Sequence, residues 1–189
     1  MNIKDIKTGD LLFLQGTTGL AMQIQNAQLQ NGNLYYQLNH VGRFLWLNGI
    51  LCIAEEDYPG VYDINIFNDE YVKSKSTVFL GRVKGKELTE EKKMELVKAS
   101  LTRASQDRLT NYAYLDILAF KVNSLSVKFF KKDFWIGRKK NKKDRYTCSQ
   151  SECKMLQEYF GIMLDQDYLR CYPADIADCK QITVSKIKY

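Results

Sequence analysis

Two residues of this chain of 189 residues have the side chains needed for nucleophilic chemistry: its single histidine, His40, and a distant cysteine, Cys148. A thiolate is a strong nucleophile, and a nearby imidazole can take the thiol proton and return it to a leaving group. A carboxylate that hydrogen-bonds the second ring nitrogen holds the imidazole in the productive tautomer. Glu55, Glu56 and Asp57 follow His40 closely and are candidates for that third group.

Cys148 lies where the sequence predicts the start of a helix. The stretch KNKKDRYTCSQSECKMLQEYFG, residues 140–161, changes from charged residues to apolar residues at helical spacing and ends at Gly161. Unpaired amides and the helix dipole stabilise an anion at a helix N-terminus, which lowers the pKa of a thiol placed there. The alternative is that Cys148 is a small buried apolar residue, as free cysteines commonly are.

A hairpin predicted around Asn48-Gly49 determines which acid can reach His40. This dipeptide favours a two-residue type I′ turn, so the numbers of paired residues sum to 97. His40 and Glu55 then share one face as diagonal neighbours, with Cβ atoms roughly 7–8 Å apart. Glu56 points to the opposite face. Asp57 would lie directly opposite His40 and is the alternative acid.

The remaining elements complete an α+β pattern of strands, helices and a last strand. We expect one domain over residues 1–189. Strands are expected in TGDLLFLQG, STVFLGRV and KQITVSKI. Helices are expected in TTGLAMQIQNAQLQNGNLYYQ and in YLDILAFKVNSL. A further helix is expected from Thr89 to about Leu109, with a core stripe of Met94, Val97, Leu101 and Ala104.

The net charge of +6 is concentrated in residues 128–145, which contain nine Lys or Arg and two Asp with aromatic residues between them. Such a segment could contact an anionic surface or polymer, or be a solvated loop. A binding module that uses this segment on nucleic acid or an anionic surface is therefore the alternative to an enzyme. The lysines expected to make that contact are Lys139, Lys140, Lys142 and Lys143.

The five cysteines are irregularly spaced, which fits reduced thiols better than a disulfide framework. The sequence contains no C-x-x-C pair, so we expect neither a structural zinc site nor another cofactor. The first residues lack the apolar core of a signal peptide, and no apolar run has the length of a membrane span. We therefore expect synthesis in the cytoplasm, with later delivery by a phage particle or a secretion device as a further option.

The order of the motifs resembles that of the circularly permuted papain-like cysteine hydrolases of the NlpC type. A Gly-Asp strand, GDLLF, is followed by NHVGRF, by CIAEEDYPGV and by a late YTCS. The resemblance spans about residues 9–178. It implies a papain-like α+β fold, with an antiparallel sheet or small barrel and helices packed on one side.

By this resemblance Cys148 is the nucleophile, His40 the general base and Glu55 the orienting acid. The implied activity is hydrolysis of an amide or ester bond through a thioacyl intermediate, on a bacterial cell-wall peptide or an acyl-lipid. The residues expected to contact substrate are Asp10, Arg43 and Tyr146.

The chain departs from the resembled pattern at three positions. Gln150 stands where relatives usually carry Glu, which makes the first turn of the helix less acidic. Glu56 stands where a small residue is usual, which leaves the choice of carboxylate open. Arg43 stands where an aliphatic residue is usual, and we expect it to alter the mouth of the site.

Overall fold

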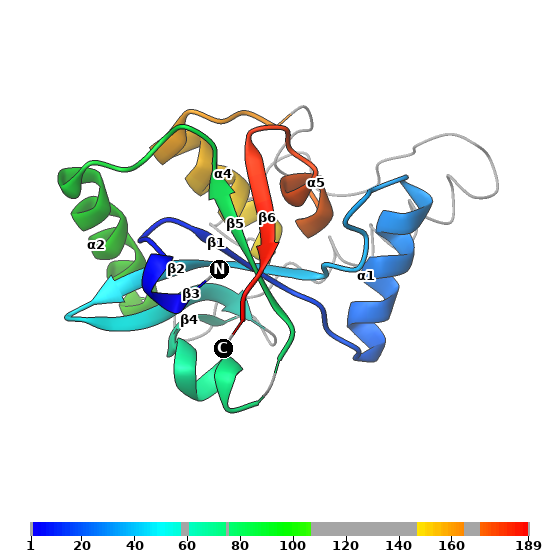
Figure 1. Ribbon diagram of the computed structural model, residues 1–189, viewed down its shortest axis with the longest axis horizontal. Coiled ribbons are helices and arrows are strands. Elements are labelled where there is room, and N and C mark those ends of the chain that lie inside the picture. The colour runs from blue at the N-terminus through cyan, green and yellow to red at the C-terminus, as the bar shows by residue number, and fades with distance from the viewer. Residues whose placement is uncertain (1, 58–60, 75, 107–146, 165–170, 189) are drawn as a thin grey trace.

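The computed structural model describes residues 2–57, 61–74, 76–106, 147–164 and 171–188 (Figure 1). Six strands form one sheet in the order β4-β3-β2-β1-β5-β6, and each neighbouring pair is antiparallel. The elements are β1 (Leu11–Leu14), α1 (Gly19–Gln30), β2 (His40–Leu47), β3 (Ile50–Asp57), β4 (Val61–Ile66), β5 (Val78–Val83), α2 (Glu90–Gln106), α4 (Cys148–Phe160), α5 (Pro173–Ala177) and β6 (Ile182–Lys186), with short turns η1 (Ile3–Asp5) and η2 (Asn68–Val72).

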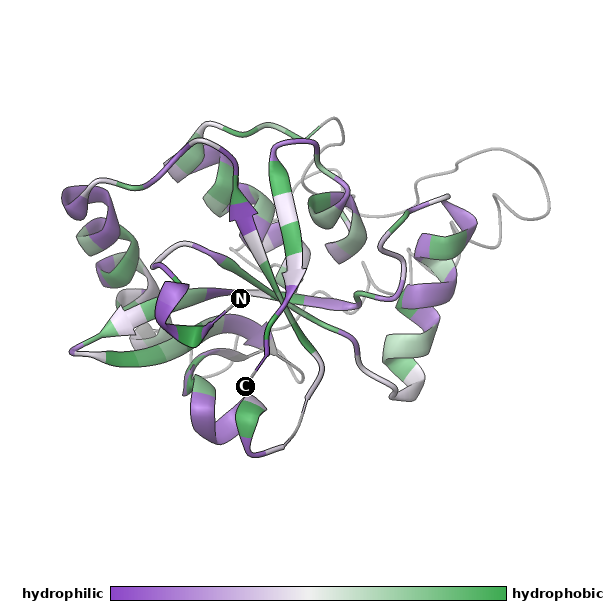
Figure 2. Ribbon diagram, in the orientation of Figure 1, coloured by the Kyte–Doolittle hydropathy of each residue, from purple (hydrophilic) through white to green (hydrophobic). Residues whose placement is uncertain are grey.

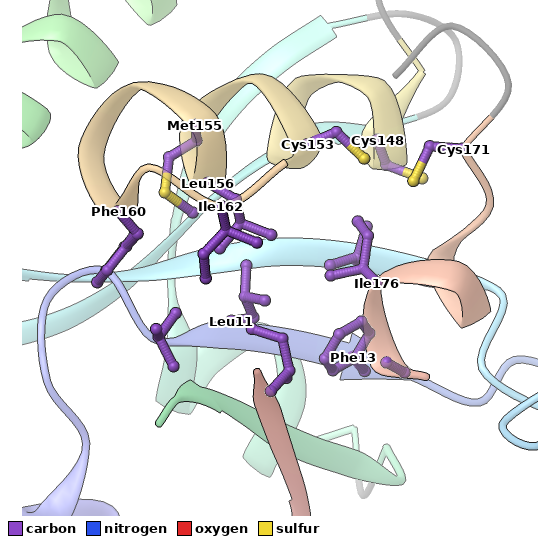
Figure 3. Packing of buried hydrophobic residues seen from close by; sticks show 14 of the residues in the cluster. Leu11, Phe13, Cys148, Cys153, Met155, Leu156, Phe160, Ile162, Cys171 and Ile176 are labelled. Atoms are coloured by element: carbon purple, nitrogen blue, oxygen red, sulfur yellow. The ribbon is translucent and has the colours of Figure 1, made fainter. Parts of the chain in front are cut away.

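Helices α2, α4 and α5 pack against one face of this sheet, where the larger core cluster lies. Figure 3 shows Leu156 and Ile162 directed from the α4 side toward Leu11 of β1. A second cluster covers the opposite face, where the ring of Phe67 meets the ring of Phe44 edge-on at 5.4 Å. The predicted α+β class, with an antiparallel sheet and helices on one side, is confirmed.

Hydropathy follows this layering. Figure 2 shows hydrophobic residues along the strands in the middle of the sheet, whereas hydrophilic and hydrophobic residues alternate along α1 and α2. Among the described helices, none is both long enough and apolar enough to cross a membrane.

The β2 and β3 strands form the predicted hairpin. Leu47 pairs with Ile50, and the register continues to Arg43 opposite Ala54, so paired numbers sum to 97. Asn48 and Gly49 both have positive φ, of 49° and 80°, as a type I′ turn requires. The prediction of a two-residue turn is therefore confirmed.

Helix α4 begins and ends where the sequence predicted. The Thr147 side chain accepts a hydrogen bond from the backbone amide of Gln150, and the Gln150 side-chain oxygen accepts one from the Thr147 amide at 2.9 Å. Gly161 ends the helix with φ of 63°. Gln150 thus serves as the second partner of a capping box, a role that does not need the negative charge of a glutamate.

The predicted core stripe of α2 is confirmed at Val97 and Ala104, which pack against the main core cluster, and is wrong at Met94 and Leu101. Met94 is 66% exposed and Leu101 47% exposed, whereas Leu96 and Ser100 are buried. The helix turns this side to the sheet because it packs against β4. Strand β4 was also missed, although the alternation of Tyr62, Ile64 and Ile66 in VYDINI is a strand pattern.

Some predictions concern residues outside the described ranges. These are the helix at 114–125, the basic segment at 128–145 with its four lysines, and Tyr146. The side chain of Asp57 is likewise not described, so this alternative acid stays a prediction.

Candidate active site

The structure brings His40, Glu55 and Cys148 together at the point where α4 begins beside the start of β2. His40 Nε2 lies 2.6 Å from Glu55 Oε2. The imidazole also makes a side-chain hydrogen bond with the Cys148 thiol. Because Nε2 is bonded to Glu55, the ring nitrogen that faces the thiol is Nδ1. The hairpin register therefore predicted that Glu55 meets the imidazole, and His40 lies between this carboxylate and the thiol.

The electrostatics of the pair favour a thiolate and an imidazolium. Burial acts to raise the pKa of Cys148, but the charge and hydrogen bond of His40 outweigh it and lower that pKa below its ordinary value. Burial acts to lower the pKa of His40, but Cys148 and then Glu55 outweigh it and raise that pKa well above its ordinary value. The two shifts have opposite signs, so both favour the thiolate–imidazolium pair over the neutral pair.

Backbone amides add to the stabilisation of the sulfur. Hydrogen bonds from the amides of Val41 and Ser149 lower the pKa of Cys148 further. One amide comes from β2 and the other from the first turn of α4, where amides have no partner within the helix. Cys148 is only 5% exposed, so these fixed dipoles replace much of the water that a free thiolate would bind.

Glu55 is 1% exposed and is held at both carboxylate oxygens. Oε2 bonds His40, and the Tyr71 hydroxyl donates to Oε1. Burial acts to raise the pKa of Glu55, but the hydrogen bond and charge of His40, with hydrogen bonds from Tyr71 and Asn65, lower it below its ordinary value. The carboxylate therefore stays ionised beside the imidazole.

Gly42 makes room for this arrangement. A Cβ atom at position 42 would lie 3.0 Å from the Cβ of Glu55 and 3.1 Å from the Ala54 carbonyl oxygen. Both approaches are tighter than most Cβ contacts, so a side chain here would force its neighbours to shift by a few tenths of an ångström. Glycine two residues after the histidine therefore leaves room for Glu55 beside the imidazole.

Glu56 takes no part in this arrangement. Its side chain is 0% exposed and forms an ion pair with Arg103 of α2, on the opposite face of β3. The prediction that Glu56 points away from His40 is confirmed.

Of the three residues expected to contact substrate, the two that the structure describes, Arg43 and Asp10, are not brought to this site. Arg43 is 6% exposed and pairs with Glu152 of α4, so it does not form the mouth of the site as expected. Asp10 binds Arg82, and its carbonyl pairs with the Phe44 amide, four residues along β2 and roughly 13 Å from His40. Tyr146 lies outside the described residues.

A groove opens beside His40, with a volume of about 590 Å³. Apolar side chains dominate its wall, and no lysine or arginine lies among the described residues that line it. Groove volumes of this order suit small-molecule ligands. The apolar wall consists of Leu14 from β1 and Leu20, Ala21 and Ile24 from α1.

Sequence reasoning missed two residues of the site, Tyr71 and Asn65. Asn65 pairs with Ile53 and is therefore the diagonal neighbour of Glu55, which the alternation of β4 could have indicated. Tyr71 lies in the η2 turn, and no local pattern indicates its contact with Glu55.

Within the described ranges, no group of three or more His, Cys, Asp or Glu side chains could hold a metal ion.

Comparison with known proteins adds to the description of the fold. No family model matches the chain, and no curated protein is significantly similar to it. Among solved structures, the chain is similar to the crystal structure of the metalloprotein yiiX from Escherichia coli O157:H7, of the group DUF1105. The TM-score is 0.62 at 16% identity, and the likeness covers 95% of this chain and 96% of that chain. At this identity the likeness establishes a shared fold.

Proposed function

We propose that the chain is a cysteine hydrolase with a permuted papain-like fold, which cleaves an amide or ester bond through a thioacyl intermediate. The observation that carries the proposal is the position of His40 between Glu55 Oε2, at 2.6 Å, and the Cys148 thiol. An antiparallel sheet with the nucleophile at the start of a helix packed across it is also what the papain-like fold requires.

The proposed reaction has two steps. The Cys148 sulfur attacks the carbonyl carbon, and the bond to the leaving group breaks as the His40 imidazolium donates its proton to the leaving oxygen or nitrogen. A water molecule then gives a proton to His40 and attacks the thioester carbon, which releases the acid and restores the thiolate. The amide of Cys148 at the helix start is one proposed donor to the oxyanion.

The groove beside His40 supports an apolar acyl group as the part of the substrate that is bound. Leu14, Leu20 and Ile24 would contact that group, whereas the described wall, which includes Glu70, has no lysine or arginine to pair with the carboxylates of a cell-wall peptide. An acyl ester or amide is therefore the substrate class that we favour over the peptide.

Hydrolysis of p-nitrophenyl esters of increasing chain length, with a peptide amide alongside, tests the proposal. Cys148→Ala should lower turnover by at least ~10³-fold, and intact mass spectrometry should find the acyl adduct only when Cys148 is present. An adduct on another cysteine, or unchanged turnover in Cys148→Ala, would contradict the proposal. Preference for the peptide would support the cell-wall substrate instead.

A matched pair of variants on α1 tests the groove. Leu20 lines the groove, whereas Leu29 is 52% exposed on the same helix and does not. Leu20→Asp should lower kcat/KM for long-chain esters about tenfold and leave acetyl esters nearly unchanged. Leu29→Asp should change neither, and equal effects of the two variants would remove the groove from the argument.

Two further results would point to a different function. Since yiiX is a metalloprotein, EDTA is included, and loss of turnover with EDTA would favour a metal-dependent reaction. The binding-module alternative, which depends on residues 128–145 outside the described ranges, predicts steeply salt-dependent binding without thiol reactivity.

A further inference from the structure

A second set of charged side chains lies behind the thiol, on the face of the hairpin opposite His40 and Glu55. Arg43 of β2 donates from Nε and Nη2 to Glu152 Oε1 of α4, at 3.0 and 2.8 Å. Its Nη2 also donates to Ser151 Oγ at 3.2 Å. Arg43 and Glu152 are 6% and 1% exposed, so β2 and α4 are joined by a buried ion pair.

A second ion pair continues this set toward α2. Arg103 pairs with Glu56 of β3, and its Nη1 donates to the same Ser151 Oγ at 3.0 Å. Its guanidinium carbon also lies 4.5 Å from the centre of the Tyr62 ring. We name Arg43, Glu56, Arg103, Ser151 and Glu152 the ion-pair cluster; its two positive and two negative charges balance.

The position of this cluster relates it to the thiol. Glu152 follows Cys148 by four residues, one helical turn along the same side of α4. Arg43 follows His40 by three residues of β2. The contact between α4 and β2 therefore has two polar attachments, first Cys148 with His40 and then Glu152 with Arg43.

We propose that Arg43 is a positioning residue, whose ion pair with Glu152 fixes the slide and rotation of α4 on β2 and so holds the Cys148 sulfur against His40. The inference rests on the proposed function, because it takes that thiol and imidazole as the reactive pair. Apolar contacts alone tolerate small slides, whereas a guanidinium that donates twice to one carboxylate is directional.

The ion-pair cluster contains unfavourably buried carboxylate oxygens, which supports a role in positioning α4 on β2 over a role in stabilising the fold. Glu56 Oε2 and Glu152 Oε2 are buried and have no hydrogen-bond partner among the described residues. Buried ion pairs can often be replaced by apolar residues without loss of stability, and a specific arrangement of the joined elements is the role that we infer for this one. The structure thus holds two incompletely satisfied carboxylates beside the helix that carries the nucleophile.

The variants that test the inference must leave the net charge unchanged. Burial raises the pKa of Glu152 and the charge of Arg43 opposes that rise, so a single replacement would also change the local field. Arg43→Met with Glu152→Met removes both charges together. Arg43→Gln with Glu152→Gln does the same and keeps a possible hydrogen bond, which provides a second variant if the first does not fold.

The measurement is the rate of alkylation of Cys148 by iodoacetamide as a function of pH, with peptide mapping, so that it needs no substrate. In the folded double variants the rate at about pH 6 should fall about tenfold and then rise with pH as for an ordinary thiol. Arg43→Lys keeps the positive charge but has a single donor nitrogen, so its alkylation rate at about pH 6 should lie between those of the wild type and the double variants.

Asp10 and Arg82 provide a matched control, because Arg82 donates to Asp10 through Nε and Nη2 at a place remote from Cys148. Asp10→Leu with Arg82→Met should leave the alkylation profile unchanged. An unchanged profile in folded Arg43 and Glu152 double variants, or an equal change in the control, would overturn the inference alone. An ordinary thiol profile in the wild-type protein would overturn the proposed function and this inference together.

Discussion

Adjacent residues of β3 anchor two buried clusters of different character. Glu55 belongs to the group of His40, Cys148 and Tyr71, whereas Glu56 belongs to the ion-pair cluster on the other face. Both glutamates are 1% exposed, so burial does not distinguish them. Their partners do.

The difference lies in how each carboxylate is satisfied. Glu55 has a partner at each oxygen, His40 at Oε2 and Tyr71 at Oε1. Glu56 has Arg103 at Oε1 and no partner among the described residues at Oε2. A carboxylate that must fix the tautomer of an imidazole needs a fixed orientation, while a counter-charge to an arginine does not.

Replacement of each glutamate by glutamine is the strongest test of this contrast. Glu55→Gln should lower turnover roughly 10²–10⁴-fold, because an amide cannot stabilise the imidazolium as a carboxylate does. Glu56→Gln should keep turnover within about threefold and lower the free energy of unfolding by about 1–3 kcal/mol, because Arg103 loses its counter-charge.

Steady-state kinetics and chemical denaturation of both variants give the comparison. Equal losses of turnover would mean that the two faces of β3 do not have separate roles. A larger loss in Glu56→Gln would make Glu56 the acid and contradict the mechanism.

The pH dependence of thiol reactivity sharpens the contrast further. The pKa of Cys148 is lowered and that of His40 is raised, so the thiolate forms at lower pH than in an ordinary cysteine and the imidazolium persists to higher pH than in an ordinary histidine. Between about pH 6 and 8, alkylation of Cys148 should therefore be faster, and should rise less steeply with pH, than alkylation of an ordinary cysteine. Cys52, whose pKa is raised by burial, should react about tenfold faster for each pH unit over that range.

Peptide mapping after brief alkylation follows both cysteines in one sample. Preferential labelling of Cys52, or a Cys148 rate that climbs as steeply as that of Cys52, would contradict the charged pair.

A smaller effect is expected from Gly42→Ala, which affects the Glu55 side of the hairpin. The added Cβ would lie 3.0 Å from the Glu55 Cβ, so the carboxylate must shift by a few tenths of an ångström and turnover should fall about tenfold. Gly19→Ala at the start of α1 is the control, because nothing lies within 4 Å of its added Cβ. Kinetics that do not differ between the two variants would show that Glu55 tolerates displacement.

The parts of the site that local sequence determines could be predicted. The Asn48-Gly49 turn sets the register of β2 and β3, and this register alone selects Glu55 over Glu56. Capping residues and the terminal glycine likewise locate the start of α4, and with it the position of Cys148. Each of these signals lies within a few residues of the feature that it determines.

The parts that depend on distant partners could not be predicted. Arg43 meets Glu152 across 109 positions, and nothing local distinguishes this arginine from one that faces substrate. The buried face of α2 contains Leu96, Ser100 and the partly buried Arg103, because Glu56 and the Tyr62 ring hold that arginine. The apolar stripe at helical spacing therefore identified the buried side at Val97 and Ala104 but not at Met94 and Leu101.

The tight turn at Asn48 and Gly49 also has a consequence for the order in which the chain assembles. His40 and Glu55 are 15 positions apart, and hairpins close in about 1–10 μs, so acid and imidazole can meet early. Cys148 must come from much further along the sequence, and such non-local contacts form later. We expect the thiol to acquire its low pKa only when α4 docks, which pulsed alkylation during refolding would time. Until then the chain carries an ordinary, weakly nucleophilic cysteine.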